Sequence, residues 1–366
     1  MSTSVELLDL MILNSKKPNK AIGCARRKHD VVIAEIPLGP ELKSLKAFRD
    51  RIRKALEPGP EARPTAQELA GFGKDLFDFI FGQSSELRDL YPRNPNVDVR
   101  IQLISDLLEI RSIPWEFMQD SREGTGPRRQ RSIVRIVPSV GHEWTKRKHG
   151  SKLKILFAAS YPLDQDRVPW HDVQDEIMTS LLPYQGAVDL KPLAPADWND
   201  LGKELERFDP DVVHFVGHGS IATGETCLFF MDKRTNASQK VDTDDLGVQL
   251  QGRDIRLVVL TACDTSSVPL DFKDRKPVPV VAEALVSRGL RAVIASQLPM
   301  PTSTAASFVG PLYRNLLDCE DIDVSVAEGR VALFTSLNNP ATSAKLEWGI
   351  PTLHRHLSGL RPFEAS

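Results

Sequence analysis

The sequence predicts an α/β fold whose mostly parallel sheet is covered by helices on both faces. In the second half of the chain, short segments that are apolar throughout alternate with segments whose apolar residues recur every three or four positions. Strands that are apolar throughout are typical of parallel sheets, because helical crossovers bury both of their faces. The sequence shows no tandem repeat and no low-complexity tract.

The first half of the chain is expected to form a smaller unit. Residues 1–30 are polar with scattered apolar positions, and we expect them to form a lead-in segment. Strands are expected over 31–36, 97–104 and 132–137, and amphipathic helices over 41–56 and 65–81. Charged stretches containing Gly or Pro, 120–131 and 146–150, are expected to be loops, so the main boundary is placed near residue 150.

The second half alternates more regularly. Strands are expected over 153–159, 186–191, 211–216, 255–261 and 292–296, and helices over 171–182, 196–208, 242–249, 280–288 and 303–317. The chain is therefore expected to comprise the lead-in 1–30, an N-terminal half 31–150 and a C-terminal half 151–366.

Composition excludes several classes of protein. A net charge of −2 over 366 residues does not fit a bulk nucleic-acid binder, which would be strongly basic. The 4 cysteines include no C-x-x-C pair, which argues against a thiolate zinc site and against a disulfide scaffold. The sequence has no signal peptide pattern and no apolar run of about 18 residues. We therefore expect a cytoplasmic protein with no membrane or direct nucleic-acid partner.

Two residues with catalytic potential follow predicted strands. In open parallel sheets, chemistry takes place beyond the carboxyl ends of the strands. His218, between Gly217 and Gly219, follows one strand, and Cys263 follows another. A thiol needs a base to become a nucleophilic thiolate, and imidazole can serve as that base. The backbone N–H groups of Gly219 and Cys263 could stabilise a tetrahedral oxyanion.

Each residue also has an ordinary structural interpretation. A lone Cys at a strand end is usually a small buried hydrophobe, and a lone His is often a satisfied core residue. His214, inside its strand, is interpreted in that way. The functional interpretation of His218 and Cys263 depends on the two occurring together, each beside small residues at the carboxyl end of a strand.

These segments resemble the CHAT family of caspase-like peptidases. The resemblance is carried by DVVHFVGHGS at 211–220, RLVVLTACDTS at 256–266 and GLRAVIASQLPMPTSTAASFVGPLYRNLL at 289–317. Ile113-Pro114-Trp115-Glu116 is similar to the family's Pro-Trp-Glu element, and 346–351 is similar to its C-terminal Trp/Pro segment. The resemblance covers roughly residues 95 to 355.

The resemblance implies a caspase–hemoglobinase fold with its catalytic half in 151–366 and a smaller, catalytically silent half in 31–150. It implies that His218 is the base and proton donor, that Cys263 attacks a peptide carbonyl to give a thioester, and that Gly219 helps to form the oxyanion hole. No metal or organic cofactor is implied. Members of the family often act as regulated proteases in bacterial defence or signalling, so a protein substrate and a separate activator or sensor protein are expected.

The sequence departs from the family pattern directly after the strand expected over 292–296. Relatives commonly carry Trp and then Asp there, whereas this chain has Gln297, Leu298 and Met300. These three residues and Asp264 are the candidates for the substrate pocket. Without the acidic residues, a strict preference for Lys or Arg at the cleavage position is not expected. Asp264 is equally well explained as a helix or turn cap.

Several features of the sequence allow other interpretations. The C-x5-R loop of a phosphatase is excluded, because Pro269 stands where the Arg should be. His354 and His356 could contribute to a metal site, but a solvated tail is the expected interpretation. The basic clusters 128–131 and 146–148 are expected to be solvated loops, with docking or self-processing within 120–150 as alternatives. A caspase-like interaction module with an idle His–Cys pair is the alternative function.

Overall fold

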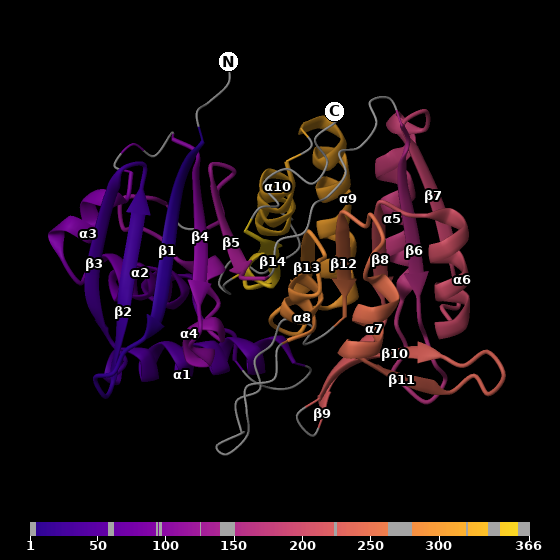
Figure 1. The fold of residues 1–366 in the computed structure, drawn as a ribbon, viewed down its shortest axis with the longest axis horizontal. Helices are drawn as coiled ribbons and strands as arrows, with labels where there is room; N and C mark the ends of the chain where they lie inside the picture. The colour runs from indigo at the N-terminus through magenta and orange to yellow at the C-terminus, as the bar shows by residue number, and fades with distance from the viewer. Residues whose placement is uncertain are drawn as a thin grey trace. The chain divides into compact units, whose positions relative to one another are not determined.

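A computed structural model of the chain divides into two compact units (Figure 1). Unit 1 comprises Met1–Ile136 and Val326–Ile350, and unit 2 comprises Val137–Ser325 and Pro351–Ser366. The structure describes residues 5–57, 62–92, 94, 97–124, 126–139, 151–222, 225–262, 280–319, 321–335 and 345–357.

Unit 1 is built on strands in the order β3-β2-β1-β4-β5. These are β1 Glu6–Asn14, β2 Lys20–Arg27, β3 Asp30–Pro37, β4 Val99–Ser105 and β5 Arg131–Val137. The first three strands pair antiparallel, whereas β1–β4 and β4–β5 are parallel. The helices are α1 Pro40–Leu56, α2 Ala66–Phe81, α3 Ser85–Leu90 and α4 Leu108–Arg111.

The expectation that residues 1–30 form a lead-in segment is wrong, because this region supplies β1 and β2. Leu8, Leu10 and Ile12 are buried on the inner face of β1. The alternation is hard to recognise in the sequence, since Leu7 and Leu13 on the other face are also apolar and are exposed. A strand with apolar residues on both faces lacks the period-two pattern that identifies a half-buried strand.

Helix α2 shows how local sequence sets an element of unit 1. Thr65 is its N-cap: the Thr65 hydroxyl accepts a bond from the Glu68 N–H, and the Glu68 carboxylate accepts one from the Thr65 N–H. This reciprocal pair satisfies donors that would otherwise be unpaired at the helix start. Phe72, Leu76 and Phe77 then recur on the buried face, as their spacing predicted.

The Pro-Trp-Glu segment anchors the core of unit 1. The Glu116 carboxylate accepts bonds from Arg135 Nε at 3.1 Å and Nη2 at 2.9 Å, and both side chains are buried. Trp115 donates its indole N–H to the Ile110 carbonyl at 2.8 Å. The Phe117 ring packs edge-on against Trp348, with 4.8 Å between ring centroids. Two sequence segments more than 200 residues apart therefore meet in one core.

Unit 2 contains the predicted parallel sheet. Its strands lie in the order β14-β13-β12-β8-β6-β7, and only the β13–β14 pair among these is antiparallel. The strands are β6 Leu153–Ala159, β7 Val188–Leu193, β8 Val212–Val216, β12 Leu257–Thr261, β13 Ala292–Ser296 and β14 Pro351–His356. Five of the six were expected from the sequence, and β14 was not.

Helices cover both faces of this sheet (Figure 1). Helices α6 Trp198–Phe208, α7 Thr243–Leu250 and α8 Val281–Ser287 contribute to one apolar cluster with alternate residues of the strands. Helices α5 Trp170–Leu181 and α9 Thr302–Cys319 pack together, and Tyr313 of α9 meets the opposite side of β8. The helix α10 Ile322–Thr335 begins in unit 2 and belongs to unit 1 from Val326 onward. The α/β fold with a mostly parallel sheet flanked by helices is confirmed.

A separate three-stranded antiparallel sheet, in the order β11-β10-β9, interrupts the alternation. Its strands are β9 His218–Ala222, β10 Glu225–Met231 and β11 Ser238–Asp242. The sequence pattern did not predict these three strands, and Gly219 in β9 has low strand propensity.

The expectation that His354 and His356 lie in a solvated tail is wrong. Both belong to β14, and their exposed fractions are 1% and 3%. Pairing with β13 carries them into the sheet. Within the described ranges, no group of three or more His, Cys, Asp or Glu residues could hold a metal ion. Over the same part of the chain, no helix is long and apolar enough to cross a membrane.

His214 is a fully buried core residue of β8, as its position inside the strand predicted. Its Nδ1 lies 3.0 Å from the Tyr313 hydroxyl and its Nε2 lies 2.9 Å from Thr261 Oγ1. Burial lowers the pKa of His214 to about 3, because a charged imidazole would lose its hydration there. The neutral ring therefore bridges β8, β12 and α9.

We predict that Glu116→Ala destabilises unit 1 strongly. The substitution leaves the Arg135 guanidinium buried without its carboxylate, which costs about 3–5 kcal/mol. Urea unfolding of the full chain measures this loss. Lys74→Ala is the control, because it breaks an exposed pair with Asp78 and should cost at most about 1 kcal/mol. Equal losses in the two variants would contradict the prediction.

We also predict that His214 makes unit 2 sensitive to acid. Its pKa is lower in the folded chain than the usual histidine value of about 6.5, so the unfolded chain binds the proton first as the pH falls. Stability is retained above about pH 6.5 and falls below it by up to about 1.4 kcal/mol per pH unit. His214→Gln, which cannot titrate, should lack this contribution. Urea midpoints measured from pH 7 to pH 4 check it, and parallel pH curves for the two proteins would contradict it.

Candidate active site

The carboxyl ends of β6, β8 and β12 come together at one edge of the unit 2 sheet. In the parallel registers, Val216 at the end of β8 lies opposite Ala159 of β6 and Thr261 of β12. The Ser160 N–H donates to the Val216 carbonyl at 2.8 Å, and the Gly217 N–H donates to the Thr261 carbonyl at 3.3 Å. The sheet edge is therefore hydrogen-bonded up to the residues that precede the candidate dyad.

Gly217 forms the bend between β8 and His218. A Cβ atom at this position would lie 2.8 Å from the Phe215 ring and 3.1 Å from the Ser160 carbonyl oxygen. A side chain would push the bend away from β6, so the close approach favours glycine. His218 follows as the first residue of β9, and its partly exposed side chain lies beyond the end of β8.

A backbone carbonyl holds the imidazole of His218. Its Nε2 lies 2.7 Å from the Asp166 carbonyl oxygen, in the segment between β6 and α5. A carbonyl oxygen only accepts hydrogen bonds, so Nε2 carries the proton. In the neutral ring Nδ1 then has a free lone pair and is the nitrogen available as a base. No sequence pattern could have identified Asp166, because its contribution comes from the main chain.

Cys263 and Asp264 lie outside the described residues. The described chain reaches Thr261 at the end of β12 and the buried Ala262 that follows it. Thr261 is fixed by its contact with His214, whose place inside the strand predicted only a core residue. The pairing of Cys263 with His218 and the role of Asp264 stay predictions.

The remaining candidate site residues lie in β9 and directly after β13. Gly219 is in β9, opposite Leu228 of β10. Gln297 and Leu298 follow β13 with exposed fractions of 3% and 1%, whereas Met300 is partly exposed. The Ser296 hydroxyl lies 3.7 Å from Met300 Sδ. Of these three pocket candidates, Met300 offers the most surface to a ligand.

In the basic cluster at 128–131, the expectation of a solvated loop holds for Arg129, whose side chain is 64% exposed, and is wrong for Arg131, whose side chain is only 8% exposed. Arg131 forms an ion pair with Glu123 and donates to the Tyr91 hydroxyl at 2.7 Å. Arg129 pairs with Glu328 at 3.0 Å. The cluster 146–148 lies outside the described residues.

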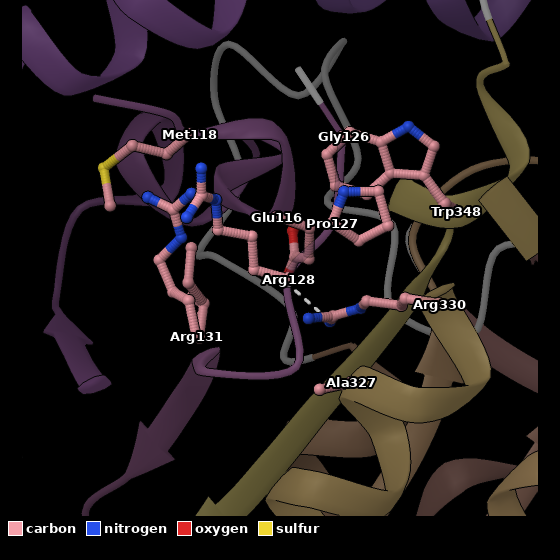
Figure 2. A pocket seen from close by; sticks show the side chains of 10 residues that line it. Glu116, Met118, Gly126, Pro127, Arg128, Arg131, Ala327, Arg330 and Trp348 are labelled. Carbon is pink, nitrogen blue, oxygen red and sulfur yellow. Dashed lines mark ion pairs between the residues drawn. The ribbon is translucent and has the colours of Figure 1, made fainter. Parts of the chain in front are cut away.

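Unit 1 contains a small cavity beside this cluster (Figure 2). Its lining residues are Glu116, Met118, Gly126, Pro127, Arg128, Arg131, Ile133, Ala327, Arg330 and Trp348. Arg330 points toward Glu116, and their charged atoms are 3.9 Å apart. The volume of about 20 Å³ accommodates about one water molecule. The cavity is therefore too small for an organic substrate.

Comparisons with known proteins agree with this fold. The family model described as "CHAT domain" matches residues 72–354. Separase from Saccharomyces cerevisiae, in its complex with securin, gives a TM-score of 0.53 at 10% identity. That match covers 96% of this chain but only 30% of the separase chain, so this chain spans less than a third of its length.

Two further solved structures give lower scores. Gingipain R, an Arg-specific cysteine proteinase of Porphyromonas gingivalis, gives a TM-score of 0.47 at 14% identity, covering 87% of this chain and 76% of that one. Caspase-1 from Spodoptera frugiperda gives 0.39 at 13% identity, covering 63% and 97%. No curated protein sequence matches the chain.

The family model covers well over half of the sequence, including both strand ends and the Pro-Trp-Glu segment. The fold of the described residues is the α/β arrangement found in the separase structure. This chain therefore belongs to the CHAT domain family.

Proposed function

We propose that the chain is a cysteine endopeptidase that cleaves a specific protein partner through a His218–Cys263 dyad. The observation that carries the proposal is the register of β8 against β12. Val216 and Thr261 lie opposite each other, and each candidate catalytic residue follows its strand end by two positions.

Strand geometry supports the pairing. Neighbouring strands are about 4.8 Å apart, and side chains two positions apart along an extended chain point to the same face. Thr261 points toward His214 on the α9 side of the sheet. A chain that continues extended from Thr261 would carry the Cys263 sulfur to this same side, within reach of a base on the neighbouring strand end.

The proposed chemistry uses the two nitrogens of His218 differently. Nδ1 takes the proton of the Cys263 thiol, while Nε2–H remains bonded to the Asp166 carbonyl and keeps the ring in place. The thiolate adds to the peptide carbonyl, and the N–H groups of Gly219 and Cys263 stabilise the oxyanion. Nδ1–H then protonates the leaving amine, and a thioester forms. Water, deprotonated by Nδ1, hydrolyses the thioester and regenerates the thiol.

The proposed substrate specificity follows from the absence of fixed acidic residues after β13. The partly exposed Met300 would give the cleavage-site pocket an apolar wall, and Asp264 would supply a negative charge near the nucleophile. Gln297 and Leu298 would support the pocket from beneath, because both are buried.

The proposed biological role is that of a regulated protease with a separate activator or sensor protein. Support comes from the family, whose members often act in bacterial defence or signalling. Separase, whose fold is similar, was crystallised in complex with the protein securin. We further propose a cytoplasmic location and a catalytically silent N-terminal half. The alternative, a non-catalytic interaction module, would have the same fold with an unreactive Cys263.

We predict that iodoacetamide modifies Cys263 selectively. His218→Ala should lower the rate of Cys263 alkylation roughly tenfold or more at pH 7. An unassisted thiol is only a few per cent thiolate at that pH, so loss of the base removes most of the nucleophile. Mass spectrometry of the labelled full chain measures the rate for each cysteine. Cys24, partly exposed on β2, is the internal control whose rate should not change.

Cleavage by the activated protein tests the same dyad. Cys263→Ala should fold normally and lose more than about 10⁴-fold of its activity, because no other group replaces the nucleophile. Equal labelling of all cysteines, with no effect of His218→Ala, would favour the interaction module.

We predict that cleavage is not restricted to Lys or Arg at the P1 position. An acidic pocket would select these residues by charge pairing, and the carboxylates expected after β13 are replaced by Gln297, Leu298 and Met300. Cleavage of a proteome-derived peptide library, with Cys263→Ala as the blank, gives the P1 profile. A strict basic preference would contradict the proposed pocket.

A further inference from the structure

The segment between β6 and α5 determines where the acceptor of His218 lies. It forms a turn in which the Gln165 N–H donates to the Pro162 carbonyl at 3.3 Å. The carbonyl of Asp166, which holds His218 Nε2, comes directly after this turn. Any movement of the turn would displace that carbonyl relative to the imidazole.

Asp164 ties the turn to the connection between β10 and β11. Its Oδ1 accepts a hydrogen bond from the Ser238 N–H and its Oδ2 accepts one from the Ser238 hydroxyl, both at 2.8 Å. The Leu163 N–H adds a third bond, to the Asn236 carbonyl at 2.8 Å. Hydrogen bonding to Ser238 lowers the pKa of Asp164, which agrees with an ionised carboxylate in this contact.

The β10–β11 connection is itself well anchored. The Asn236 N–H donates to the Asp232 carbonyl at 2.7 Å, and the Asp232 side chain accepts a bond from the Arg234 N–H at the same distance. Asn236 has a φ of +57°, which suits the tight turn. Lys233 Nζ then pairs with Asp200 of α6 at 2.6 Å. The connection can therefore act as a fixed support for the Asp164 turn.

His218 belongs to the same small sheet. It lies in β9 opposite Phe229 of β10, and β10 pairs in turn with β11, which begins at Ser238. The His218 backbone is thus part of the β9–β10–β11 sheet. The Asp166 carbonyl that holds its Nε2 is fixed to the same sheet through Asp164.

We propose that Asp164 is a positioning residue whose contact with Ser238 keeps the Asp166 carbonyl on Nε2 of His218 and so directs Nδ1 toward Cys263. This inference rests on the proposed function for its catalytic consequence, but the effect on His218 itself can be measured independently. Without the contact, the turn 162–166 would lose both of its bonds to Ser238 and keep the Leu163 bond to Asn236. The imidazole would then exchange between its two neutral tautomers.

An ordinary structural role for Asp164 makes a different prediction. Asp164 and Ser238 meet at the surface, where such bonds contribute little to global stability. If the contact only held a surface loop in place, its loss would leave both the global stability of the chain and the tautomer of His218 unchanged. The tautomer of His218 therefore discriminates between the two roles.

The experiment uses the full chain carrying ¹⁵N-labelled histidine, with His218→Asn to assign the resonance. Long-range ¹H–¹⁵N correlation spectra report which nitrogen of the neutral ring carries the proton. Wild type should show His218 as the Nε2–H tautomer. Asp164→Ala should give a mixture of tautomers and lower the rate of Cys263 alkylation roughly fivefold to tenfold, since misplaced groups lose reactivity steeply.

Two variants control this result. Asp164→Asn should restore most of the wild-type behaviour, because its amide can accept from the Ser238 N–H while donating to the Ser238 hydroxyl. Asp189→Ala removes an exposed carboxylate of β7 in the same unit and should change neither measurement. Circular dichroism melting confirms that all variants remain folded.

The outcomes separate the two proposals. A His218 tautomer that is unchanged in Asp164→Ala, or changed equally in Asp189→Ala, overturns the positioning role. A wild-type His218 that is not the Nε2–H tautomer overturns it as well. Cys263 alkylation that does not depend on His218 defeats the peptidase proposal instead, while a tautomer shift confined to Asp164→Ala still supports the positioning role.

Discussion

The hydrogen-bonded ladder between β8 and β12 is the constraint on which the candidate active site depends. Its register sets Val216 opposite Thr261, and the Gly217–Thr261 bond extends the ladder to the bend before His218. Beneath it, the neutral ring of His214 bridges Thr261 and Tyr313. A slip of one residue in a strand would reverse the faces of its side chains, so this buried bridge also helps to specify the register.

The two units use buried polar groups for different purposes. In unit 1, the Glu116–Arg135 pair stabilises a core built from distant parts of the sequence. In unit 2, the polar contacts of His214 lie directly below the strand ends where reactive side chains are expected. The first arrangement satisfies charges that would otherwise be costly to bury, whereas the second fixes main-chain positions without introducing any charge.

The sequence predicted the parallel sheet well because its strands are buried on both faces and their apolar runs are unbroken, as in Leu153–Ala159. It failed for β1, whose outward residues are also apolar, and for β14, whose two histidines suggested exposure. At the site, sequence patterns indicated His218 and the bend-forming Gly217. They could not reveal Asp166 or Asp164, because a main-chain carbonyl and a contact between Asp and Ser in two separate turns leave no local pattern.

The division of unit 1 between Met1–Ile136 and Val326–Ile350 has a consequence for synthesis on the ribosome. Domains generally fold in order as they emerge, N-terminal first. Here Trp348, which packs against Phe117, is made only after most of unit 2 has been translated. The Phe117 side of the unit 1 core therefore stays incomplete until residues 326–350 have been synthesised, so unit 1 cannot finish folding before most of unit 2 has been translated.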